Sequence, residues 1–122
     1  MSTKEKYDFD SWDEDAETAA IADLAEDLTK IRRIIVGDKI VFEMPDKKHI
    51  ELTLKLQTKD MLAVSKLETG GSDFQALMAL LDLLKDKQTS DQLSEYHVST
   101  VAKVATDYFN VLGKVTQASL GK

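Results

Sequence analysis

The chain contains no cysteine, and this absence excludes disulfides, thiolate nucleophiles and cysteine-based metal sites together. Histidine is also scarce. Only His49 and His97 are present, so a site with three histidine ligands is excluded, and the two do not stand in a metal-ligand spacing. No apolar run approaches the length of a membrane span, and no signal peptide opens the sequence. We therefore expect a soluble intracellular protein.

Aromatic residues make up only 7% of the chain, whereas 43% of its residues are apolar. This apolar content is enough for a substantial core and argues against wholesale disorder. The core must then be mostly aliphatic. A length of 122 residues corresponds to one domain.

Positive charge is weak and the acidic residues are unevenly placed. The net charge is −6, and residues 1–28 alone contain ten acidic and two basic side chains. The remaining residues are nearly balanced, with twelve acidic and fourteen basic side chains. The tight basic clusters, Lys30-Arg32-Arg33 and Lys47-Lys48, are short. Nucleic-acid binding is therefore disfavoured, because it needs a concentrated positive surface.

The front of the chain predicts a flexible tail followed by an acidic helix. Residues 1–10 are polar and show no period, whereas residues 11–30 have helical spacing. Ser11 and Glu14 match a capping box, and the cations at the far end suit the negative pole of the helix. The apolar stripe consists of Ile21, Leu24, Leu28 and Ile31. Whether this helix packs on the domain is left open.

The next stretch predicts three antiparallel strands. Two β-branched runs, Ile34–Val36 and Ile40–Phe42, flank Gly37-Asp38, which is a hairpin signal because glycine tolerates positive φ. Pro45-Asp46 ends the second strand. Alternation over residues 49–56 then predicts a half-buried strand. Its inward residues are Ile50, Leu52, Leu54 and Leu56.

Helical spacing returns after this meander. Thr58 is the expected cap of one helix, the segment 69–72 interrupts it, and Ser72 caps another that runs to about Lys87. Residues 88–98 are predicted to be a polar link with one helical turn. Ser99 is the expected cap of a last helix, and residues 117–122 are expected to be weakly structured. Together these elements predict an α+β fold in a single domain over 11–122, with three to four C-terminal helices.

No motif points to catalysis. The acidic run 13–17 lacks the central glycine and distal glutamate of a calcium loop. The glycines at 70 and 71 precede a helix but lack both the phosphate-loop pattern and a preceding strand. Ser72 has no base and orienting acid in its sequence context. We therefore expect a protein that is not an enzyme, with no metal or cofactor, and protein binding is the functional class that remains.

The layout resembles that of the tail assembly chaperones of long-tailed bacteriophages and prophages. The shared features are an acidic N-terminal segment, the hairpin Ile34–Met44, the strand Ile50–Leu56, the Leu/Met-rich helices split by a glycine turn, and the small-residue ending Ala118–Lys122. The resemblance covers about residues 31–122. It is a likeness of layout, with no motif of functional residues to transfer. The ending is similar to the shorter of two forms that such families make by ribosomal frameshifting.

The resemblance implies a partner and a place. Such chaperones bind the long helical tape-measure protein, and the tail-tube protein is a second candidate partner. They act in the cytoplasm of the bacterial host and are not expected in the mature virion. Apolar residues of the two long C-terminal helices are the predicted contact set, with no nucleic acid or membrane involved: Phe74, Leu77, Met78, Leu81, Tyr108, Phe109 and Leu112.

Two other hypotheses remain open. An acidic inhibitor would use residues 5–27 to imitate nucleic-acid phosphates and occupy a basic protein, and its binding would fade steeply with salt. A minor structural protein of a phage tail or connector would instead be found in purified particles, although three short strands are few for a tube subunit.

Overall fold

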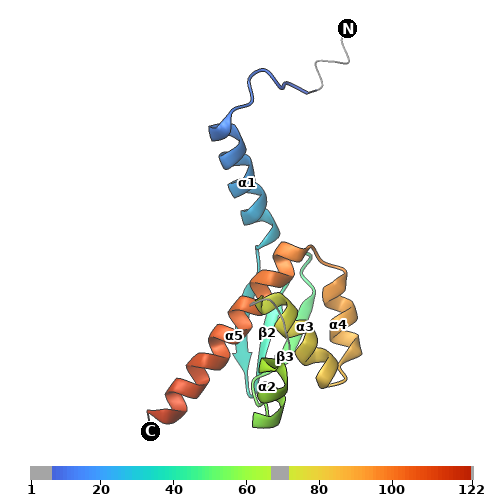
Figure 1. Ribbon diagram of the computed structural model, residues 1–122, viewed down its shortest axis with the longest axis vertical. Coiled ribbons are helices and arrows are strands. Elements are labelled where there is room, and N and C mark those ends of the chain that lie inside the picture. Colours follow the sequence, from blue (N-terminus) through green and yellow to red (C-terminus); the bar gives the residue numbers. More distant parts are fainter. Residues whose placement is uncertain (1–6, 67–71, 122) are drawn as a thin grey trace.

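The computed structural model describes residues 7–66 and 72–121, which form five helices and one three-stranded sheet (Figure 1). This confirms the predicted α+β fold, with an N-terminal helix, a strand meander and C-terminal helices. The elements are α1 (Glu14–Leu28), β1 (Arg32–Val36), β2 (Lys39–Glu43), β3 (His49–Thr53), α2 (Thr58–Ser65), α3 (Asp73–Leu83), α4 (Lys87–Ser94) and α5 (Val98–Leu120).

The sheet is the predicted antiparallel meander, with strand order β1-β2-β3. Gly37 forms the first hairpin turn with a φ of 63°, a backbone conformation that glycine adopts at little cost. The register pairs Ile35 with Ile40 and Phe42 with Ile50. Because directly paired residues share a face, the apolar residues at even positions of β2 and β3 form one buried face. These residues are Ile40, Phe42, Ile50 and Leu52.

Helices α3 and α5 complete the core. Helix α3 packs against α5 and also against α2 and α4, so its apolar residues on more than one side are used, as its composition predicts. Leu77, Leu80 and Leu81 are its buried residues. Helix α5 contributes Val101, Val104, Ala105, Tyr108 and Val111.

A buried carboxylate ties the edge strand β1 to α5. Asp107 is a side chain of α5 that is only 8% exposed. Its Oδ2 lies 3.1 Å from Arg33 of β1, and its Oδ1 lies 3.1 Å from Lys103 one helical turn earlier. Arg33 is directly paired with Phe42, so it occupies the helix-facing side of the sheet. Both cations therefore neutralise a charge that would otherwise be costly to bury.

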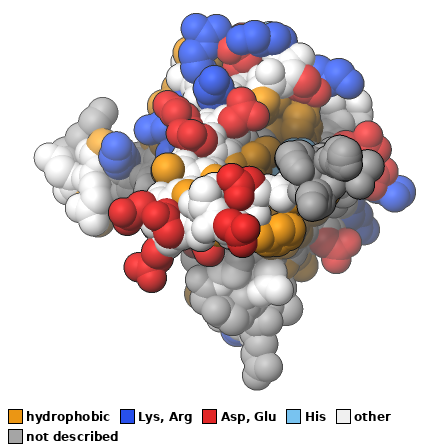
Figure 2. Space-filling model, turned by 90° about the horizontal axis from the view of Figure 1, so that it is seen from above, with side chains coloured by type: hydrophobic (Ala, Val, Ile, Leu, Met, Phe, Trp, Pro, Cys, Tyr) orange, Lys and Arg blue, Asp and Glu red, His pale blue; other side chains and the backbone are white. Residues whose placement is uncertain are grey.

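Helix α1 projects away from the rest of the molecule (Figure 1). It has no buried residue, and its attachment lies at its C-terminal end, where the Thr100 hydroxyl of α5 donates a hydrogen bond to the Leu28 carbonyl. Residues 7–28, hereafter the acidic arm, contain nine acidic side chains and no basic one. Figure 2 looks down on the molecule from this end and shows acidic and hydrophobic side chains next to one another on the surface.

The start of α1 differs from the prediction. The N-cap is Asp13, whose carboxylate accepts a hydrogen bond from the Ala16 amide at 2.8 Å, and not Ser11. Ser11 instead donates its own amide and hydroxyl to Asp8. A carboxylate caps at least as well as a hydroxyl and gains more from the positive helix end. The predicted cations do not close the helix, because Lys30 follows its last turn and the two arginines belong to β1.

The C-terminal boundaries also differ. Helix α3 ends at Leu83, and a separate helix, α4, occupies most of the predicted polar link. The N-cap of α5 is His97 and not Ser99, and the helix continues to Leu120, so the predicted weak ending is wrong. Helix α2 begins one residue before expectation, with Gln57 at the cap. Ser72 does cap α3 by accepting from the Gln75 amide, whereas the predicted break at 69–71 lies outside the described residues.

Candidate functional site

The groups that could support chemistry are dispersed. Within residues 7–66 and 72–121, no three His, Asp or Glu side chains come together to hold a metal ion. His49 is exposed at the start of β3, and His97 is exposed at the cap of α5. His49 lies directly opposite Glu43 of β2 in the sheet, and that carboxylate is engaged by Arg32 at 2.7 Å. None of the helices in this part of the chain is long and apolar enough to span a bilayer.

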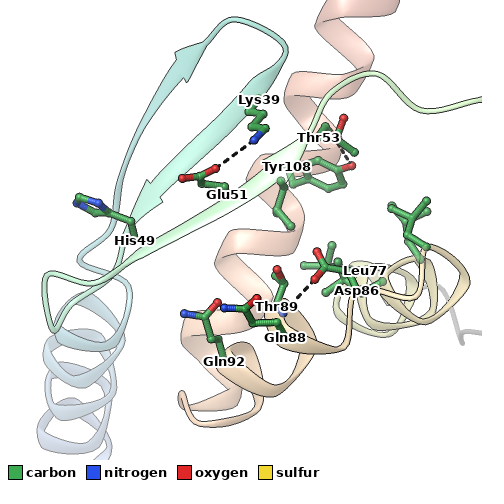
Figure 3. Close-up of a pocket in the computed structure, with 14 residues that line it drawn as sticks. Lys39, His49, Glu51, Thr53, Leu77, Asp86, Gln88, Thr89, Gln92 and Tyr108 are labelled. Carbon is green, nitrogen blue, oxygen red and sulfur yellow. Dashed lines mark hydrogen bonds and ion pairs between the residues drawn. The ribbon is translucent and has the colours of Figure 1, made fainter.

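A cavity of about 470 Å³ lies between β3 and the α3–α4 region (Figure 3). Several of its polar groups are engaged within the protein. Lys39 contacts Glu51 at 3.4 Å, and the Asp86 carboxylate caps α4 by accepting from the Thr89 amide at 3.2 Å. The Tyr108 hydroxyl donates to the Thr53 carbonyl at 2.7 Å. These contacts hold the surrounding elements together, and none of them joins a nucleophile to a base, as catalysis would need.

Two tyrosines have raised pKa values for structural reasons. Burial raises the pKa of Tyr108, whose ring lies in the hydrophobic core. Burial, with help from a 2.8 Å hydrogen bond to Asp46, raises the pKa of Tyr96 to about 12. In Asp46 partial desolvation is outweighed by hydrogen bonds from Tyr96 and from the Lys48 amide, so the pKa of this carboxyl is lowered. A tyrosine with the ordinary pKa of about 10 is already protonated at neutral pH, and these shifts extend its protonation to more alkaline pH, so neither phenol acts as a base.

A different surface is free of charge altogether. A hollow of about 320 Å³, hereafter the apolar groove, lies between the distal half of α5 and the segment from the end of β3 to α2. None of its lining side chains is charged. They are Leu54, Leu56, Met61, Phe109, Leu112, Gly113, Val115 and Thr116.

The groove exists because α5 is longer than the core that it covers. Val111 is the last buried residue of the helix, yet the helix continues to Leu120. Apolar residues at helical spacing therefore extend beyond the interior. Met61 on α2 and Val115 on α5 are 37% and 40% exposed, so they present apolar surface to solvent.

The predicted contact residues divide between this groove and the core. Phe109 and Leu112 line the groove. Leu77, Leu81 and Tyr108 are buried, so a partner on the surface of the folded domain cannot reach their side chains. Phe74 and Met78 are half-buried and pack against the core from α3. The two helices that carry the predicted contact set, α3 and α5, pack directly against each other. The apolar groove lies instead between α5 and the segment 54–61.

Sequence reasoning did not single out the exposed apolar residues of β1. Ile34, Ile35 and Val36 are 62%, 57% and 57% exposed. A signal was present, because three consecutive apolar residues in a strand face alternate sides and at least one must face away from the core. Of the groove residues, Leu54 and Leu56 were predicted to face the core, and Met61 and Val115 were not among the predicted contact residues.

Comparisons with protein-family models, curated proteins and solved structures found no match for this chain.

Proposed function

We propose that this protein is a tail assembly chaperone of a long-tailed phage or prophage, which binds an apolar helical stretch of the tape-measure protein through its apolar groove. The observation that carries this proposal is the uncharged groove itself. It combines exposed aliphatic residues from two elements with Phe109 and Leu112 of the predicted contact set. Helix-in-groove binding uses such a surface to cover the apolar side of a partner helix.

Charge supports the second half of the role. A tape-measure chain has long apolar helical faces, and a complex with it must stay dispersed. The net charge of −6 gives the complex like-charge repulsion, which opposes association between complexes. The groove and the arm occupy different parts of the molecule, so binding and dispersal do not compete for the same residues.

The test is co-expression with the tape-measure protein encoded in the same phage or prophage. We expect the chaperone to increase the soluble yield of that protein and to be captured with it. Val115→Glu places a charge in the groove and is expected to abolish both effects, because an unpaired carboxylate cannot be covered by an apolar helix. Leu83→Glu is the matched control, since Leu83 is 42% exposed, close to the 40% of Val115, and lies outside the groove.

Failure of the wild-type chain to form a complex or to raise the soluble yield would count against the chaperone function. Equal loss in both variants would show that the groove is not the contact surface. Each variant needs an unchanged circular-dichroism spectrum, so that loss of binding is not loss of folding.

The acidic arm supports one alternative, an inhibitor that occupies a basic protein. Nine acidic side chains without a basic one, on an exposed helix and its approach, form a surface of single sign. This function predicts that deletion of residues 7–28 abolishes binding and that affinity falls steeply with salt. The chaperone function predicts that the deletion spares capture of the tape-measure protein, whereas Val115→Glu does not.

A further inference from the structure

The face of the sheet that points away from the helices carries apolar surface. Residues 34 and 41 are paired, as are residues 36 and 39, so Ile34, Val36 and Val41 share this face. Ion pairs flank them, with Arg32 on Glu43 at 2.7 Å and Lys39 on Glu51 at 3.4 Å. A shallow hollow of about 350 Å³ lies over Ile34 and Val41. We refer to these residues together as the outer sheet face: Arg32, Ile34, Val36, Lys39, Val41, Glu43 and Glu51.

Edge strands with exposed apolar residues are normally protected, because they otherwise attract a second chain. In β1 all five residues are exposed, and only the first two carry charge. Helix α1 also exposes apolar residues to solvent. Its residues Ile21 and Leu24 are 61% and 59% exposed and continue toward Leu28 at helical spacing. Within the described part of the chain, none of the residues of α1 is buried. An isolated helix of 15 residues is only marginally stable in water.

Helix α1 and β1 match in length, and the acidic arm and the strand meander differ in the sign of their net charge, although the charges on the outer sheet face itself balance in the pairs Arg32–Glu43 and Lys39–Glu51. Nine acidic side chains lie in the acidic arm, whereas residues 29–56 contain seven basic and four acidic ones. Helix α1 is about 22 Å long and β1 about 17 Å, so one spans the other. Within one chain they do not meet, because α1 points away from the domain while β1 runs into it (Figure 1).

We propose that two copies of this chain form a two-fold dimer in which α1 of each copy lies across the outer sheet face of the other. A second copy is the occupant that the structure favours, because each copy carries an exposed apolar stripe on α1 and an exposed apolar sheet face, and because the acidic arm is attracted to the net positive meander and repelled by a second arm. A two-fold axis relates the two copies, so the contact between α1 of one copy and the outer sheet face of the other occurs twice. Ile21 and Leu24 of one copy cover Ile34 and Val41 of the other. This dimer does not depend on the apolar groove or on the proposed function.

The absence of cysteine allows a direct test by single-cysteine cross-linking. Full-length Leu24→Cys and Ile34→Cys variants are mixed and oxidised mildly, and the products are identified by mass spectrometry. We expect the mixed disulfide to predominate over either self-linked product. Leu62→Cys is the control, since Leu62 is 54% exposed on α2, away from both surfaces, and is expected to link to neither variant.

Light scattering coupled to gel filtration supplies a second readout without cysteines. We expect the wild-type chain to have the mass of a dimer. Ile34→Glu should raise the dissociation constant at least about tenfold. Leu62→Glu, a comparable substitution of an exposed apolar residue, should leave it unchanged.

Three results would overturn the proposal. A monomeric mass for the wild-type chain at about 100 μM, a hundred times a micromolar Kd, would exclude the dimer. Predominant self-linking of the Ile34→Cys variant would assign the interface to β1–β1 edge pairing. Predominant self-linking of the Leu24→Cys variant would assign it to the paired arms. Because the tape-measure protein is absent from these experiments, their outcome is separate from that of the co-expression test.

Discussion

The carboxylate of Asp107 offers a test of how β1 is held, because it joins two cations while being almost fully buried. We predict that Asp107→Asn, which preserves shape but removes the charge, lowers the free energy of unfolding by about 2 kcal/mol. Hydrogen bonds to charged groups contribute roughly 1.5–3 kcal/mol each in protected sites. Arg33 and Lys103 are 42% and 45% exposed, so water partly compensates them once the carboxylate is gone.

The matched comparison is Glu43→Gln, which breaks the outer pair with Arg32. Arg32 is 79% exposed, and exposed pairs contribute about 0–1 kcal/mol, so this variant should cost well under half as much. Urea unfolding followed by far-ultraviolet circular dichroism is the appropriate assay. Fluorescence is less informative, because Trp12 is the one tryptophan and lies in the acidic arm. Equal costs for the two variants, or a larger cost for Glu43→Gln, would refute the role assigned to Asp107.

Further predictions concern the turn, the core tyrosine and alkaline pH. Gly37→Ala should lower the free energy of unfolding by about 1 kcal/mol because φ is positive there, whereas Gly113→Ala inside α5 should raise it by about 0.5–1 kcal/mol. Both sites have open space for a methyl group, so the backbone conformation alone should separate them. Changes of the same sign in urea unfolding would contradict this reasoning. Tyr108→Phe should lose about 1 kcal/mol with the bond to Thr53, and no loss would show that this bond contributes nothing net. The pKa of Tyr96 is about 12 in the folded state and about 10 in the unfolded state. Its contribution to stability is therefore complete below pH 10 and falls as the pH rises from 10 to 12. The Tyr96→Phe variant should lose less stability than the wild type across that range, and an identical loss would contradict the prediction.

The strand meander could be predicted from local chemistry. Gly37 between two β-branched runs specifies a tight hairpin, and the alternation from Ile50 to Leu54 specifies which face is buried. Both signals are contained within a few residues, and the sheet register agrees with them. The same holds for Ser72, where one hydroxyl and the following amide define the start of α3.

Helix α4 could not be recognised by its period, because Leu93 is its only buried residue. It depends instead on the Asp86 cap and on the insertion of that one leucine into the core. The start of α1 was ambiguous for another reason. Ser11 and Asp13 both suit an N-cap, and Ser11 is engaged by Asp8 in the structure. Neighbouring polar side chains decide such a choice, and their geometry is not in the sequence.

Only part of the apolar groove could be predicted from the sequence. Phe109 and Leu112 were predicted because their helix has more apolar positions than one stripe requires. The position of Met61 and Leu56 beside α5 could not be predicted, because it depends on how α2 packs beside the distal half of that helix. Separation of Phe109 from buried Tyr108 likewise required the tertiary fold, in which the two rings lie 5.2 Å apart at 58°.

The central claim is that the apolar groove holds an apolar helix of another polypeptide. Its most direct test is methyl NMR of the chain titrated with an amphipathic segment of the tape-measure protein. We predict that shift changes concentrate at Leu54, Leu56, Met61, Leu112 and Val115. Changes confined to Ile21 and Leu24 of the acidic arm, or no change anywhere at saturating peptide, would contradict the claim.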